Sequence, residues 1–375
     1  MKVPFFRHNI ERADIGRVEK VLRGPVLTTG AYVRTFEEKL TAFLGVRGGH
    51  VRGTTSCTSA LFLSLEAHGI GRGDEVITTP LSYVATAHVI EQVGAKPIFV
   101  DVDPRTGNIN VDHIAEAITK KTKAILPVHL YGQMVDMKKI SRIARAHKLV
   151  VIEDAAHALE AERDGIRPGM LSDAACFSFY ATKSITSGEG GAVITRHASV
   201  ADHIAKTRLH GVSRSMADRY GKLYQHYDIP VLGWKFNMTN IQAALLIGQL
   251  ARARKIWKRR VAIAERYERA FREASIEFLQ TDPGVVHARH LSTILVDAPR
   301  RDEILHALES HGIGIAVNYR PIHLMTYYRE KYGYTEGDFP HAESIGARTV
   351  TLPLYSKLTD KEVSKVIETV EKILS

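Results

Sequence analysis

The stretch EVITTPLSYVATAHVIEQVGAKPIFVD (75–101) joins two short apolar runs through a segment with helical periodicity. The runs EVITT (75–79) and KPIFVD (96–101) are typical of buried strands, and 83–93 between them is typical of a helix. A strand, a helix and a strand in this order favour a parallel sheet that is covered by helices on both faces.

The same alternation continues in both directions along the chain. Further buried strands are predicted at 123–129, 148–153, 174–179 and 191–194. Further helices are predicted at 59–68, 111–119 and 137–147, and helices separated by a turn-rich stretch at 11–46. The sequence therefore predicts an α/β fold with a mostly parallel central sheet.

The pattern changes after residue 240. A long helical segment at 241–272 is followed by a strand candidate at 291–296 and by helices at 301–311 and 360–374. A chain of 375 residues is long enough for two domains. We predict a large α/β domain over 1–250, with the N-terminal segment, and a small C-terminal α+β domain over 251–375.

Composition excludes several classes of protein. With 45% hydrophobic and 25% charged residues the chain is neither collagen-like, nor a coiled coil, nor largely disordered. Cys57 and Cys176 are the only cysteines, which excludes a disulfide framework and a zinc cluster, and we expect no metal. No apolar run approaches 18 residues and the N-terminus is polar too early for a signal peptide. We expect a soluble cytoplasmic protein without a membrane partner.

The chain is basic, with 51 Lys and Arg against 41 Asp and Glu and a net charge of +10. Such a charge attracts anions of any kind, including nucleic acid, phosphate and nucleotides. The segment ARARKIWKRR (251–260) holds six of the basic residues. At helical spacing they spread around the helix, which favours a solvated face, and no nucleic-acid-binding motif accompanies them. We therefore expect no nucleic-acid partner.

Several reactive side chains follow the predicted strands, where ligands of open α/β sheets bind. Asp154 and Lys183 each follow a strand, Ser56–Ser59 precedes a helix, and Ser82–Tyr83 begins another. Taken singly, each is more often a helix cap, a turn or a solvated residue. Together they supply the amine, the acid, the phosphate cradle and the aromatic face that pyridoxal phosphate requires.

The segment FSFYATKSITSGEGGAVIT (177–195) resembles the lysine motif of sugar-nucleotide aminotransferases of the DegT/DnrJ type. Further segments match that family in order: LTTG (27–30), SCTSALFLSL (56–65), GDEVITTPLSYVATAHVI (73–90), GAKPIFVDVDP (94–104), VIEDAAHALEA (151–161), GWKFNMTNIQAALLIGQL (233–250), HGIGIAVNYRPIHL (311–324) and LPLY (352–355). The resemblance spans nearly the whole chain. It implies a fold type I pyridoxal-phosphate-dependent transferase, related in architecture to aspartate aminotransferase.

The resemblance also implies roles for residues around the cofactor ring. Lys183 would be the Schiff-base lysine and general base, and Asp154 would keep the pyridine nitrogen protonated. His157 would lie near the phenolic oxygen, and Tyr83 would stack on the ring.

At the phosphate, the family implies contacts from Thr58, Ser59 and Ser178. The segment Lys235–Asn237 would reach the phosphate from a second subunit. Near the substrate, the matching motifs place Thr29, Tyr319, Arg320 and His323.

This chain departs from the common family pattern at Cys57, Lys235 and Asn237, where many members have Gly, Asn and Arg. Lys suits a phosphate by charge, so the contact from a second subunit is still expected.

By resemblance, the chain is an aminotransferase that moves an amino group from an amino acid, expected to be L-glutamate, to a keto group of a nucleotide-linked sugar. Pyridoxamine phosphate would be the intermediate form, and the enzyme would be a homodimer with shared active sites in amino-sugar biosynthesis. Two alternatives stay open: an aminotransferase acting on a keto-cyclitol, and a non-catalytic regulator that binds pyridoxal phosphate or a nucleotide sugar. The sugar, the nucleotide and the aminated carbon are not specified by the sequence.

Overall fold

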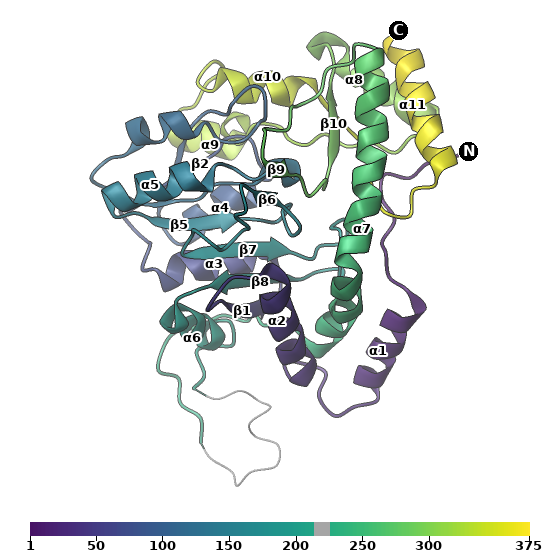
Figure 1. Ribbon diagram of the computed structural model, residues 1–375. Coiled ribbons are helices and arrows are strands. Elements are labelled where there is room, and N and C mark those ends of the chain that lie inside the picture. Colours follow the sequence, from purple (N-terminus) through teal and green to yellow (C-terminus); the bar gives the residue numbers. More distant parts are fainter. Residues whose placement is uncertain (214–225) are drawn as a thin grey trace.

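A computed structural model describes residues 1–213 and 226–375, and a seven-stranded sheet lies at its centre (Figure 1). The strands follow the order β1 (His50–Thr54), β8 (Gly191–Thr195), β7 (Ala174–Ser178), β5 (Val150–Asp154), β4 (Thr122–Ile125), β2 (Glu75–Thr78) and β3 (Lys96–Phe99). The pairs from β7 to β3 are parallel, and β8 runs antiparallel to both of its neighbours. The predicted α/β class and mostly parallel sheet are confirmed.

Alternate side chains of the central strands enter two different hydrophobic clusters, as the two-residue repeat of a strand requires. Val76, Ala124 and Ile152 face a cluster with α3 (Cys57–Ala67), α4 (Ala85–Gln92) and α6 (Ala198–Thr207). Their neighbours Ile77, Ile125 and Val151 face α2 (Ala31–Leu44), α5 (Met137–His147) and part of α7 (Asn240–Glu273). Both faces are thus buried, which explains why these strands read as continuous apolar runs.

The C-terminal part of the chain forms another hydrophobic cluster. It combines the end of α7 with β10 (Ser292–Leu295), β11 (Thr349–Leu352), α8 (Arg301–Ser310) and α11 (Asp360–Leu374). The 34-residue α7 contributes Leu250 and Ile256 to the sheet cluster and Ile263 and Phe271 to this one (Figure 1). Val3 also packs here and pairs with Ile313. The domain division at residue 250 stays a prediction.

The remaining elements are short. They are α1 (Arg12–Leu22), β6 (Glu162–Arg163), β9 (Val285–Val286), α9 (Thr326–Tyr332) and α10 (Pro340–Arg348).

The helix predicted at 111–119 is wrong. The chain forms two 3₁₀ turns there, Val111–His113 and Ala115–Ala117, with hydrogen bonds between residues three apart. The backbone is already extended at Ile118, because it must enter β4 at Thr122. Val111 and Ile114 are buried three residues apart, a spacing that 3₁₀ turns and an α-helix share, so periodicity alone does not separate the two.

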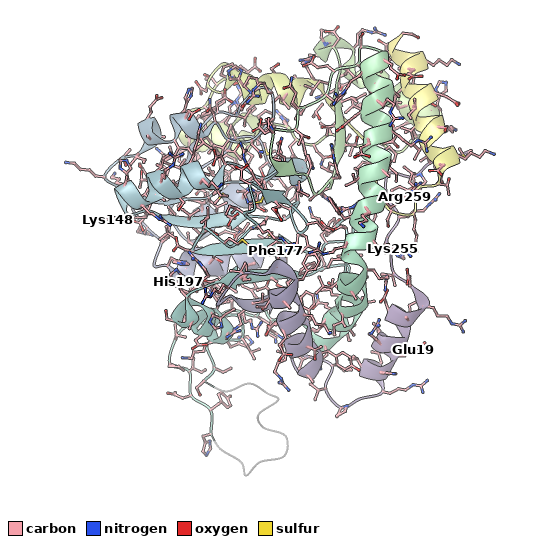
Figure 2. The ribbon with its side chains drawn as sticks, in the orientation of Figure 1. Glu19, Lys148, Phe177, His197, Lys255 and Arg259 are labelled. Carbon is pink, nitrogen blue, oxygen red and sulfur yellow. The ribbon has the colours of Figure 1, made fainter. Side chains whose placement is uncertain are left out.

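The basic segment 251–260 is not simply a solvated face of α7. Figure 2 labels Lys255 and Arg259 on this helix, and Arg259 pairs with Asp360 at 2.8 Å. Arg252 pairs with Asp14 at 2.7 Å, and Arg260 is buried against Glu160 at 2.8 Å. Half of the six cations are therefore held in ion pairs within the chain. Within the described residues, no helix combines the length and the apolar character that crossing a bilayer demands.

The carboxyl edge of the sheet depends on a close backbone contact at Gly191. A Cβ at this position would lie 2.2 Å from the carbonyl carbon of Ser56 and 2.5 Å from the nitrogen of Cys57. These are backbone atoms at the start of α3, which cannot move as a flexible side chain could. Gly191 thus lets β8 pass directly beside the first turn of α3.

We predict that Gly191→Ala lowers the free energy of unfolding by about 2–3 kcal/mol, because the added methyl overpacks this contact. Urea unfolding of the purified protein measures the effect. Gly16→Ala is the matched control: Gly16 lies inside α1 with open space around it, so this change should stabilise the helix by about 0.5–1 kcal/mol. Equal stability of the Gly191→Ala variant and the parent would contradict the prediction.

Candidate active site

A cavity of about 560 Å³ opens at the carboxyl edge of the sheet. This volume is typical of sites for small molecules and cofactors. It is lined by seven of the residues predicted to form the site: Thr58, Tyr83, Asp154, His157, Ser178, Lys183 and Tyr319. Parallel strands bring the ends of β5 and β7 to one edge, so residues far apart in sequence meet there.

Asp154 is the last residue of β5, and its side chain is buried in the wall of the cavity. One carboxylate oxygen accepts a hydrogen bond from the Thr86 hydroxyl at 2.8 Å, and the other accepts from the backbone N–H of Ala156 at 3.1 Å. Burial raises the pKa of Asp154, whereas these two hydrogen bonds and the charge of Lys183 lower it. A carboxylate that is buried and has few hydrogen bonds is stabilised by a cation beside it.

Lys183 lies in the loop after β7, where its N–H donates to the carbonyl of Tyr180 at 2.9 Å in a tight turn. Its amine is 3.2 Å from Nε2 of His290. Loss of water around the amine lowers its pKa to about 8, and the negative charge of Asp154 opposes that shift. More of the amine is therefore neutral near physiological pH than in an ordinary lysine, and the neutral form is the one that acts as a nucleophile or base.

His157 is buried and held in one tautomer by its hydrogen bonds. Nδ1 accepts from the backbone N–H of Tyr131 at 3.2 Å, so the neutral ring carries its proton on Nε2. Nε2 lies 3.2 Å from the Tyr319 hydroxyl, and the two rings stack. Burial and the charge of Lys183 lower the pKa of His157. The imidazole is thus a fixed N–H donor at the cavity wall.

The predicted phosphate ligands are not equivalent. Thr58 and Ser178 line the cavity. Ser59 does not: its hydroxyl bonds back to the nitrogen and the carbonyl of Ser56, while the Ser56 hydroxyl caps α3 by accepting from the Ser59 N–H. The start of this helix carries the positive end of the helix dipole. A phosphate role for Ser59 stays a prediction.

Tyr83 lies at the open end of the cavity, with 61% of its surface exposed. Its ring is 6.2 Å from that of Tyr319. Tyr83 is thus accessible from the cavity, and its stacking on the cofactor ring stays a prediction.

Other predicted residues lie outside the cavity of their own chain. The Asn237 side chain accepts from Nζ of Lys235 at 2.6 Å and donates to the Thr29 hydroxyl at 2.8 Å. Arg320 is exposed, and His323 is fully buried against Glu343 at 2.9 Å. Substrate or cofactor contacts of these residues stay predictions.

Sequence reasoning missed several residues of the cavity wall, among them Phe5, Thr86 and His290. Thr86 could have been found, because it lies in the first turn of the helix that follows Ser82–Tyr83; in the structure its hydroxyl is 3.0 Å from that of Ser82. Phe5 comes from the N-terminal segment and His290 from the segment before β10, and nothing in their local sequence indicates that they reach the cavity.

Comparison with known proteins identifies the family. The profile of the DegT/DnrJ/EryC1/StrS aminotransferase family matches residues 8–371. The chain belongs to this family.

Its similarity to individual members covers nearly the full length of both proteins. It is 40% identical to the spore coat polysaccharide biosynthesis protein SpsC of Bacillus subtilis, over 99% of this chain and 97% of SpsC. It is 43% identical to a protein of Methanocaldococcus jannaschii, over 100% of this chain and 98% of that protein. Spr1654 of Streptococcus pneumoniae, assigned as a sugar aminotransferase, superposes with a TM-score of 0.93 at 31% identity, over 99% of this chain and 98% of Spr1654.

Spr1654 is known in forms with pyridoxal phosphate and with pyridoxamine phosphate. For the present chain, these comparisons confirm the predicted fold type I architecture and pyridoxal phosphate as the cofactor. The cavity fits that group, because it combines a buried carboxylate, an amine with a lowered pKa and the hydroxyls of Thr58 and Ser178. Among the described residues, no group of His, Cys, Asp and Glu side chains is arranged to hold a metal ion.

The Thr86–Asp154 hydrogen bond gives a prediction. Thr86→Val keeps the shape of the side chain but removes the donor, so the pKa of Asp154 rises further and its oxygen loses its orientation. A hydrogen bond to a charged group contributes about 1.5 kcal/mol or more, so pyridoxal phosphate should bind about tenfold more weakly. Titration of the cofactor-free protein, followed by absorbance, measures this. Thr86→Ser retains the hydroxyl and should bind as the parent does; equal weakening in both variants would contradict the role of the hydrogen bond.

Proposed function

We propose that this aminotransferase moves an amino group from L-glutamate to the keto group of a nucleotide-linked sugar in amino-sugar biosynthesis. The observation that carries the proposal is the placement of Lys183 and Asp154 in one cavity at the carboxyl edge of the sheet. The similarity to SpsC, a spore coat polysaccharide biosynthesis protein, supports a sugar pathway. The net charge of +10 suits an anionic nucleotide substrate, which it would help to collect at low salt.

Pyridoxal phosphate, when bound, carries the amino group between substrates and withdraws electrons from the reacting carbon. Asp154 would hold the proton on the ring nitrogen, because its buried carboxylate favours a cation beside it. The Lys183 amine would take the proton from the donor's α-carbon and return it later, as its lowered pKa permits. The Nε2–H of His157 would donate a hydrogen bond to an oxygen of the bound cofactor. Thr58 and Ser178 would hold the phosphate through their hydroxyls.

We further propose a homodimer in which Lys235–Asn237 of one subunit reaches the phosphate of the other. Lys235 is exposed, and it does not line the cavity of its own chain. The large apolar side chains of Leu232 and Trp234, just before it, are also exposed. An exposed apolar segment beside a cation fits a surface that is covered by a second copy of the chain.

The donor half of the reaction can be tested without knowing the acceptor. We expect the protein with pyridoxal phosphate to show a visible absorbance band that bleaches when L-glutamate is added. Lys183→Ala should lose this band and turnover, because the amine is gone. Lys120→Ala, at an exposed lysine away from the cavity, should behave as the parent does. Full activity of Lys183→Ala would contradict the proposal, and cofactor uptake without bleaching by any amino acid would favour a binding protein instead.

The acceptor class needs a second assay. The pyridoxamine form of the enzyme is mixed separately with a nucleotide-linked 4-keto-6-deoxy sugar and with a keto-inositol. Return of the visible band with the sugar alone would support the proposal. Return with the keto-inositol alone would overturn it in favour of a cyclitol aminotransferase.

Shared active sites predict complementation between inactive variants. Lys183→Ala and Lys235→Ala chains, co-expressed in equal amounts, should form hybrid dimers that contain one intact site. Since half of the dimers would be hybrids, about a quarter of the parent activity should return. Lys183→Ala with Asp154→Asn is the control, because these residues belong to one chain's cavity and no intact site can form. Equal recovery in both mixtures, or none in the first, would contradict sharing through Lys235.

A further inference from the structure

We infer that His290 is a further catalytic residue, whose neutral Nε2 accepts a hydrogen bond from the Lys183 amine whenever that amine is free of the cofactor. The inference rests on the proposed role of Lys183.

The contact is direct. Nζ of Lys183 and Nε2 of His290 are 3.2 Å apart, and both residues line the cavity. A protonated lysine amine has donors and no lone pair, so the imidazole nitrogen must be the acceptor when Lys183 is charged. Lys183 comes from the loop after β7 and His290 from the segment before β10, so the pair joins segments that are far apart in the sequence.

His290 is held in place by the turn that also holds His157. The backbone N–H of His290 donates to the carbonyl of Tyr131 at 3.0 Å, and the N–H of Tyr131 donates to Nδ1 of His157. Ala288, two residues before His290, donates to the carbonyl of Gly132 at 2.8 Å. A Cβ at Gly132, where φ is +106°, would meet Ala288 and Arg289 at about 3 Å. One tight turn therefore positions both histidines, whose ring centroids are 4.4 Å apart.

Burial keeps His290 neutral, and the neighbouring charges of Lys183 and Arg260 act in the same direction. Four titratable groups face or approach the Lys183 amine from different elements: Asp154, Cys57, His157 and His290. Burial and the charge of Lys183 lower the pKa of His290, and burial raises that of Cys57. Asp154 is then the one anion within the buried wall of the cavity, and Glu189 lies at its exposed rim. The uncharged imidazole is left with a lone pair on Nε2 for the lysine.

This acceptor has a use in the proposed reaction. When Lys183 removes a proton from the donor's α-carbon, the C–H bond breaks, its electron pair stays behind, and Nζ becomes an ammonium. An ammonium in a cavity with little water needs acceptors. His290 supplies one and keeps Nζ within reach for the return of the proton, without itself gaining charge.

The test compares His290→Phe, which keeps the ring volume but has no acceptor, with His290→Gln, which retains one. The full chain is loaded with pyridoxamine phosphate, so that Lys183 carries no covalent bond. The rate of carbamylation of Lys183 by cyanate is measured against pH, and the modified peptide is quantified by mass spectrometry. Lys120 in the same samples is the internal control.

His290→Phe should lower the pH midpoint for Lys183 by about one unit, because loss of a hydrogen bond to a charged group disfavours the ammonium. His290→Gln should stay close to the parent, and the midpoint for Lys120 should not move. An unchanged midpoint in His290→Phe, or the same shift in both variants, would overturn the inference. If His290→Phe does not fold, His290→Leu, which also lacks an acceptor, takes its place.

The pH midpoint for carbamylation of Lys183 is measured without turnover, so it does not depend on whether the enzyme reacts with L-glutamate. If the parent fails to react with L-glutamate, the proposed function falls, while the comparison of midpoints still decides whether His290 acts on Lys183. If the midpoints do not differ, the proposed function stands without a role for His290.

Discussion

The carboxylate of Asp154 lies in a cavity wall where it has lost most of its water, and the architecture of the site follows from that constraint. Its oxygens accept from the hydroxyl of Thr86, the N–H of Ala156 and, at 4.0 Å, the thiol of Cys57. Its pKa is raised, so the ionised form destabilises the cofactor-free fold above that pKa, and this cost is absent below the ordinary pKa of about 3.9. A cation in the cavity offsets the cost, as the protonated ring of the cofactor would.

Glu153, the residue before Asp154, points to the opposite face of β5 and holds the end of this strand through hydrogen bonds. Its carboxylate accepts from Nε2 of His129 at 2.6 Å, from the N–H of Gly169 at 2.8 Å and from the Ser172 hydroxyl. Nδ1 of His129 accepts from the N–H of Val135, so this imidazole is neutral and donates through Nε2. The two adjacent carboxylates of β5 therefore differ. That of Glu153 is hydrogen-bonded inside the fold, whereas that of Asp154 faces the cavity.

The hydrogen bonds of Glu153 and the close contact at Gly191 hold one side of the cavity, and segments outside the central sheet supply the other. Phe5, His290 and Tyr319 come from these segments. The turn at Tyr131–Gly132 connects the two sides, because its backbone bonds to His157, which follows β5, and to His290, which precedes β10. A change in this turn would therefore change the surroundings of the Lys183 amine.

The sequence alone was enough for the central strands, the long α7 and the placement of Asp154 and Lys183 near one sheet edge. Apolar runs, helical periodicity and the parallel arrangement that they imply are local signals, and the motif around Lys183 is specific. It misjudged 111–119, because the buried Val111 and Ile114 are three residues apart, a spacing that 3₁₀ turns and an α-helix share. Tertiary structure alone decided that Arg260 is buried against Glu160 and that His290 meets Lys183. Such contacts join residues up to 107 positions apart, and they depend on how packed elements approach one another rather than on local sequence.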